Sequence, residues 1–298
     1  MKNLFYIISI IFIGACLFSN AKLIQAGSRM KVQKENYADL LNFKGRFLDP
    51  QEWVGDEAEA IKLKRAAEIQ DKVVVYKNRS KLYFWIILGL NIVFLAFVFF
   101  AYSLYKKYIV LGLLISALMC LHVGLMYPML EIMAFERDLD IGELPIKTNV
   151  MGFNVDLKVA QKFDGDMVFY YQSKSVMELV QILFQQKNWI VGISIMTFSI
   201  IFPLLKLLGI IGILFSDKLK NAKFINSFVV HSGKWSMADV FVVSVFLAFL
   251  AFSNMQVGIK TESNVLLGLY FFFAYCILSM ASSSYLKIVE ERIQLSRQ

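Results

Sequence analysis

The sequence has few of the residues that build metal sites, disulfides or redox centres. It contains three cysteines and two histidines among 298 residues. Each cysteine lies in an apolar segment, and no two have the CxxC spacing of a zinc-binding pair, so we expect neither a disulfide framework nor a metal. His122 and His231 are too few and too far apart for a metal cluster. No nucleotide-binding glycine motif or hydrolase triad is present, and we expect no cofactor and no enzymatic activity.

Apolar residues, in contrast, are abundant. Hydrophobic residues make up 58% of the chain, 27 residues are phenylalanine and the mean hydropathy is +0.58. A soluble protein could not bury that much apolar surface, so the sequence predicts a polytopic membrane protein. The net charge of +8 comes largely from basic residues beside apolar segments, where they set orientation. We therefore expect no nucleic-acid partner.

The apolar runs predict an all-α polytopic membrane protein with a four-helix transmembrane module at residues 106–288. The predicted spans of this module are residues 108–128, 189–215, 238–255 and 264–285. One extra transmembrane helix is expected at 82–105, and residues 289–298 form a cytoplasmic tail.

The N-terminus has three interpretations. Residues 1–21 have the apolar run and small residues of a cleaved signal peptide, while Cys16 ends a weak lipobox and would be lipidated. The third interpretation is an uncleaved N-terminal anchor. All three place residues 22–81 outside the cytoplasm, where we expect short helices on a flexible stalk, either a docking surface or a solvated linker.

The loop at residues 129–188 is predicted to carry a small extracytoplasmic β-hairpin. Val155–Phe163 alternates apolar and polar residues, Asp164-Gly165 is a strong turn signal, and Met167–Tyr171 follows. Ser175–Phe184 reads as a short amphipathic helix. Lysine-rich short loops on the opposite side predict that side to be cytoplasmic.

Residues 189–215 carry two unusual residues within an apolar span. Pro203 has no N–H, so the carbonyl of Ser199 loses its helical partner and the helix is expected to kink. Burying Lys206 costs at least about 2.5–3.5 kcal/mol. We expect this face to point into protein or a hydrated cavity. The alternative is that Lys206 snorkels along the helix to the headgroups.

A second group of polar residues lies at the start of the predicted span at 238–255. Ser236 and Asp239 form a capping box, and Trp235 would lie at headgroup level. Either these residues simply start a helix, or Asp239 and Lys206 belong to one buried polar network. His122, inside another span, is a helix–helix hydrogen-bond partner or a functional group.

Two of these stretches carry a resemblance to a known family. Phe202-Pro-Leu-Leu-Lys-Leu-Leu208 and Gly233-Lys-Trp-Ser-Met-Ala-Asp-Val-Phe-Val-Val243 resemble the paraquat-inducible protein A family, and Tyr127-Pro128 and the helix from Ser175 follow the family's order. The resemblance covers Tyr108 to Leu286. It implies an inner-membrane component of lipid trafficking across the Gram-negative envelope that works with MCE-domain proteins. It also implies that Pro203, Lys206, Trp235, Ser236 and Asp239 line or brace a polar pocket.

The chain departs from the family pattern in its organisation. Many relatives have two modules and cysteine-rich zinc ribbons, whereas this sequence has one module, no ribbon cysteines and an extra span. A homo-oligomer is one way to supply a second module. Two other functions remain open: a small-solute or ion transporter that uses Lys206, Asp239 and His122, and a cargo-free assembly subunit in which residues 22–81 bind a partner.

Overall fold

The computed structural model describes residues 2–49, 56–150, 153–215 and 260–295, and these are mostly helical. The helices are α1 (Lys2–Leu40), α2 (Phe43–Phe47), α4 (Asp56–Ala101), α5 (Lys106–Met126), α6 (Val176–Gln185), α7 (Trp189–Met196), the π-helical turn η1 (Thr197–Ile201), α8 (Phe202–Phe215) and α11 (Leu267–Leu295). The strands are β1 (Leu130–Val150), β2 (Phe153–Lys174) and β3 (Lys260–Val265). Five of the helical segments described are long and apolar enough to cross a membrane. The predicted fold class is confirmed, and the predicted span at 238–255 lies outside the described residues.

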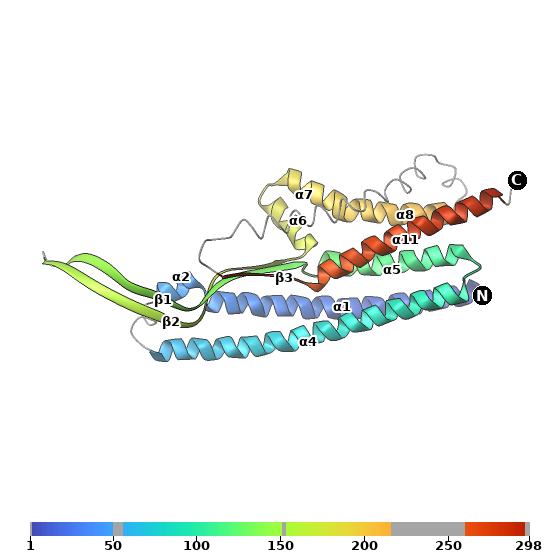
Figure 1. Ribbon diagram of the computed structural model, residues 1–298. Coiled ribbons are helices and arrows are strands. Elements are labelled where there is room, and N and C mark those ends of the chain that lie inside the picture. The colour runs from blue at the N-terminus through green and yellow to red at the C-terminus, as the bar shows by residue number, and fades with distance from the viewer. Residues whose placement is uncertain (1, 50–55, 151–152, 216–259, 296–298) are drawn as a thin grey trace.

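The molecule is elongated, with a helical body and a β-hairpin at one end (Figure 1). Helices α1 and α4 run side by side, and α5 and α11 lie against each other beside them. The start of α1 and the end of α11 lie at the end of the helical body that is far from the hairpin. At that same end, Lys107 Nζ lies 4.4 Å from the ring centroid of Phe215, at the end of α8. The lysine turn between α4 and α5 is thus on the side of the termini, as the predicted orientation requires.

The N-terminal region differs from the expected short helices on a flexible stalk. α1 is one helix of 39 residues and α4 one of 46, so neither breaks at the predicted boundaries at residues 21/22 and 81/82. Residues 56–81 contain no glycine or proline and many strong helix formers. A helix already nucleated in an apolar span can therefore propagate through them at little cost. The prediction of a flexible stalk was wrong.

One face of the first half of α1 packs against the helical body. Phe5, Phe12 and Cys16 belong to one buried cluster with residues of α4 and α5, and Cys16 is fully buried. The rings of Phe12 and Phe94 stack with centroids 4.0 Å apart. The three interpretations of the N-terminus stay predictions.

The three strands form an antiparallel sheet in the order β2-β1-β3. Asp164 and Gly165 lie inside β2, so the prediction of a hairpin turn there was wrong. At this point the register of β1 and β2 shifts, Gly165 has a φ of +79°, and its N–H donates to Asp138 of β1 at 2.8 Å. The dipeptide forms a β-bulge. A β-bulge, like the predicted tight turn, can place a glycine in the left-handed region.

Two further parts of the predicted loop can be compared with the structure. The amphipathic helix expected at Ser175–Phe184 is present as α6, and Ser175 and Glu178 form a reciprocal capping box at its start. β3 was not predicted: part of it was assigned to a brief turn and part to the last span. The last helix therefore begins at Leu267 rather than at residue 264.

Candidate functional site

The helix that carries Pro203 is distorted immediately before the proline. α7 passes into the π-helical turn η1, in which the N–H of Phe202 donates to the carbonyl of Thr197, five residues back. Because Pro203 has no N–H, it cannot donate to Ser199, and a wider turn takes up the mismatch. The distortion expected at Pro203 is present, and its form is a π-bulge.

Lys206 lies on the inward face of α8, one turn after Pro203. Its residue exposure is 3%, and Pro203, Leu207, Ile210 and Ile213 are buried on the same side. The opposite side of the helix presents large apolar residues with high exposure, namely Leu205, Leu208 and Ile211. A snorkelling lysine would keep its ammonium at the surface. The inward orientation predicted for Lys206 is therefore the one that the structure has.

His122 lies on α5, which contacts α8. The imidazole is half-buried, and its Nδ1 atom is enclosed with no hydrogen-bond partner among the residues that the structure describes. One hydrophobic cluster contains Leu121 and Val123, which flank His122, together with Leu207 beside Lys206. The two predicted residues thus flank a common apolar core.

The remaining predicted site residues, Trp235, Ser236 and Asp239, lie outside the described residues. The structure brings Pro203 and Lys206 together on one face of α8 and places His122 on a helix that contacts α8. The proposed network of Asp239 with Lys206 stays a prediction.

A second polar region, which the sequence did not reveal, joins α1 to the sheet and α6. We call it the polar collar: Lys31, Lys34, Tyr37, Glu131, Asp166 and Glu178. Lys31 Nζ lies 2.6 Å from Glu178 Oε1, and Lys34 Nζ lies 2.6 Å from Glu131 Oε1. The Tyr37 hydroxyl donates to Asp166 at 2.9 Å. The spacing of Lys31, Lys34 and Tyr37 puts them on one face of a helix and was the only available signal.

Glu131 is the most deeply buried carboxylate of the collar, with 4% exposure. It accepts from Lys34 and from the Tyr171 hydroxyl, the latter at 3.1 Å. Burial, together with the negative charge of Glu131, raises the pKa of Tyr171 above its usual range, so the phenol stays protonated and donating. A buried carboxylate with two donors fixes the position of β1 against α1.

The described residues contain no group of three His, Cys, Asp or Glu side chains that could hold a metal ion. Cys16, Cys120 and Cys276 are all buried, and none is in a disulfide.

Five long apolar helices among the described residues indicate a multi-pass helical membrane protein, and one of them carries a lysine buried close to a π-bulge. Residues 165–289 match the family model of paraquat-inducible protein A, which confirms the resemblance over this range. The match starts in β2 and includes Pro203 and Lys206, whereas α1, α4 and α5 precede it. No curated protein and no solved structure matches the chain.

Proposed function

We propose that this protein is an inner-membrane component of an envelope lipid-trafficking system, and that the inward face of α8 holds the headgroup of a lipid. The burial of Lys206 beside the π-bulge is the observation that carries the proposal. The match to the paraquat-inducible protein A family supports it, because the resemblance implies lipid traffic in the envelope.

The chemistry of the buried face suits an anionic lipid. A lysine ammonium is a compact point charge that binds phosphate well, and at low dielectric this attraction is stronger than in water. Leu207, Ile210 and Ile213 lie on the same face, within the apolar core that α8 shares with α5 and α11, so the surroundings of the ammonium are apolar. A site that combines a buried ammonium with apolar surroundings favours a phospholipid over a small inorganic anion.

The shape of the molecule supports a partner outside the membrane. At about 1.5 Å per residue, the 46 residues of α4 extend about 70 Å, more than twice the roughly 30 Å of a bilayer core. The polar halves of α1 and α4 and the hairpin thus project well beyond the apolar region, and we propose that an MCE-type envelope protein docks on this projecting part.

The proposal is tested by native mass spectrometry of the purified protein and its Lys206→Ala variant. Loss of a charge-assisted contact of about 1.5–3 kcal/mol weakens lipid binding about tenfold or more, so the lipid-bound fraction falls. Lys107→Ala is the matched control, because it removes a lysine at the end of the bundle near the termini. Equal lipid retention in wild type and Lys206→Ala would contradict the proposal.

A cargo-free assembly subunit is the second candidate, and the docking of α1 on the sheet through the polar collar favours it. In that case charge reversal at Lys34 (Lys34→Glu) would abolish function in cells while lipid retention stayed the same. The lipid-handling proposal expects Lys206→Ala to abolish both.

A further inference from the structure

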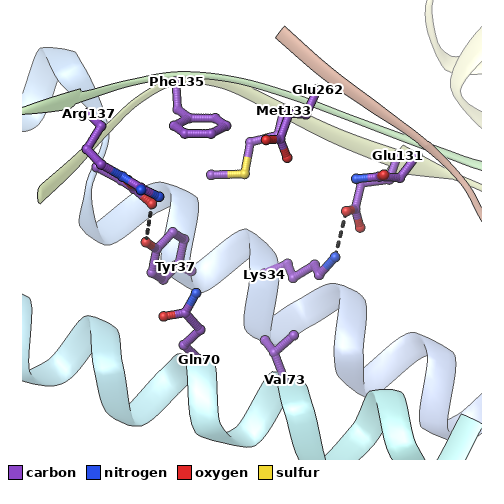
Figure 2. Close-up of a pocket in the computed structure, with 11 residues that line it drawn as sticks. Lys34, Tyr37, Gln70, Val73, Glu131, Met133, Phe135, Arg137 and Glu262 are labelled. Atoms are coloured by element: carbon purple, nitrogen blue, oxygen red, sulfur yellow. Dashed lines mark hydrogen bonds and ion pairs between the residues drawn. The ribbon is translucent and has the colours of Figure 1, made fainter. Parts of the chain in front are cut away.

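A cavity of about 260 Å³ lies between the sheet and the polar halves of α1 and α4 (Figure 2). The sheet forms its roof, while Tyr37 and Lys34 of α1 and Gln70 and Val73 of α4 rise from below. Pockets for drug-sized ligands are usually about 300–1,000 Å³, so this one suits a smaller molecule or a headgroup. It is separate from the buried face of α8.

The roof of the cavity follows from strand alternation. Glu131, Met133, Phe135 and Arg137 occupy alternate positions of β1 and all line the cavity. Residue Glu262 of β3 pairs with Met133 in the antiparallel register, and it also faces the cavity. Strand β3 therefore adds a carboxylate to the roof that the β1–β2 hairpin alone would lack.

The charges that line the cavity do not balance. Two cations, Lys34 and Arg137, face three carboxylates, Glu131, Asp166 and Glu262, which leaves one net negative charge. Lys34 is paired with Glu131 at 2.6 Å, and Arg137 with Asp166 at 3.1 Å. Within the described part of the chain Glu262 is in no ion pair.

The rest of the lining indicates what kind of cation fits. Val73, Met133 and Phe135 give apolar walls, and Tyr37 and Phe135 contribute aromatic rings, a type of side chain to which ammonium groups are attracted. An inorganic metal ion fits poorly, because the described residues hold no cluster of three ligating side chains. An anion would meet the unpaired Glu262 and find both cations already engaged.

We propose that this cavity binds an organic ammonium group, with Glu262 as its counter-charge and the apolar and aromatic walls around its carbon atoms. The group could come from the headgroup of an aminophospholipid or from a free amine. The lipid source rests on the proposed function above, whereas recognition of the ammonium group does not.

The test measures binding of butylammonium and of its uncharged analogue butanol to the full chain in detergent, by isothermal titration calorimetry. Wild type is expected to bind butylammonium and to ignore butanol. Glu262→Gln weakens binding about tenfold, the effect of losing one charged partner. Glu136→Gln makes the same change on β1, at a residue that does not line the cavity, and leaves affinity unchanged. Equal binding of butanol, no binding of butylammonium, or an unchanged affinity in Glu262→Gln would overturn the proposal.

Competition identifies the source of the ammonium group. In nanodiscs that contain phosphatidylethanolamine, butylammonium should bind more weakly than in nanodiscs of phosphatidylglycerol if the headgroup occupies the cavity. Equal affinity in the two would support a free amine and overturn the lipid source. The Lys206→Ala variant should bind butylammonium as wild type does. The proposal for this cavity and the proposal for the α8 face are therefore tested independently.

Discussion

Replacing Arg46 by methionine is expected to open the junction of α2, α4 and β2. The Arg46 side chain is 1% exposed and its Nη2 lies 2.5 Å from Glu59 Oε1. It also donates to the backbone carbonyls of Asp164 and Asp166, and its guanidinium lies 5.6 Å from the ring centroid of Phe163. Removing one partner of a buried ion pair costs about 3–5 kcal/mol, because the remaining groups stay buried without a counterpart.

Hydrogen–deuterium exchange of α2 and of the adjoining part of β2 measures this loss as a fall in the free energy of local opening. Arg65→Met is the matched control, since Arg65 is exposed on the same helix as Glu59 and should exchange as wild type does. If α2 kept wild-type protection in Arg46→Met, the junction would not depend on this ion pair.

Gly124→Ala is expected to destabilise the contact between α5 and α11. A Cβ at this position would lie 2.9 Å from the backbone N and Cα of Phe272, closer than real Cβ contacts allow. Neither backbone can yield without separating the two helices, and overpacking of this kind costs about 1–3 kcal/mol. Glycine at a helix interface is what permits such a close approach.

Gly89→Ala provides a control that is expected to raise thermal stability rather than lower it. Gly89 is exposed in α4, and a Cβ there would meet nothing within 4 Å. Alanine is the better helix former by about 0.8–1.0 kcal/mol, so Gly89→Ala should slightly raise the midpoint of thermal unfolding in detergent while Gly124→Ala lowers it. A similar rise in both variants would show that the α5–α11 contact is looser than the structure has it.

The parts of the fold that sequence could predict depend on local signals. The spans follow from apolar length, and the inward orientation of Lys206 follows from the cost of a charge in lipid. The distortion at Pro203 follows from its missing N–H, although the choice of a π-bulge over a sharp kink depends on packing around α8.

The parts that sequence missed depend on contacts between distant residues. The Asp164-Gly165 dipeptide suits a turn or a bulge equally, and pairing with Asp138 on β1 decides between them. β3 has no apolar alternation and becomes a strand because β1 offers it a free edge. The polar collar joins residues such as Lys34 and Glu131, 97 positions apart, so no local pattern marks it.

The long N-terminal helices show a different limit of prediction from sequence. Composition correctly indicated helix formers in residues 56–81, but it could not show that the helix is continuous with the following span. Continuity turns a presumed linker into a rigid arm, and the collar fixes α1 of that arm to the sheet.

The most direct test of the lipid-handling account is photo-crosslinking from α8 in native membranes. A diazirine side chain at Leu207, which is 3% exposed on the Lys206 face, would report a lipid in the bundle, whereas one at Leu208, which is 62% exposed, reports bulk lipid. The account predicts lipid crosslinks from both positions, with those from Leu207 lost in a Lys206→Ala background and those from Leu208 kept. Crosslinks from Leu207 that are absent in wild type, or that persist unchanged without Lys206, would contradict it.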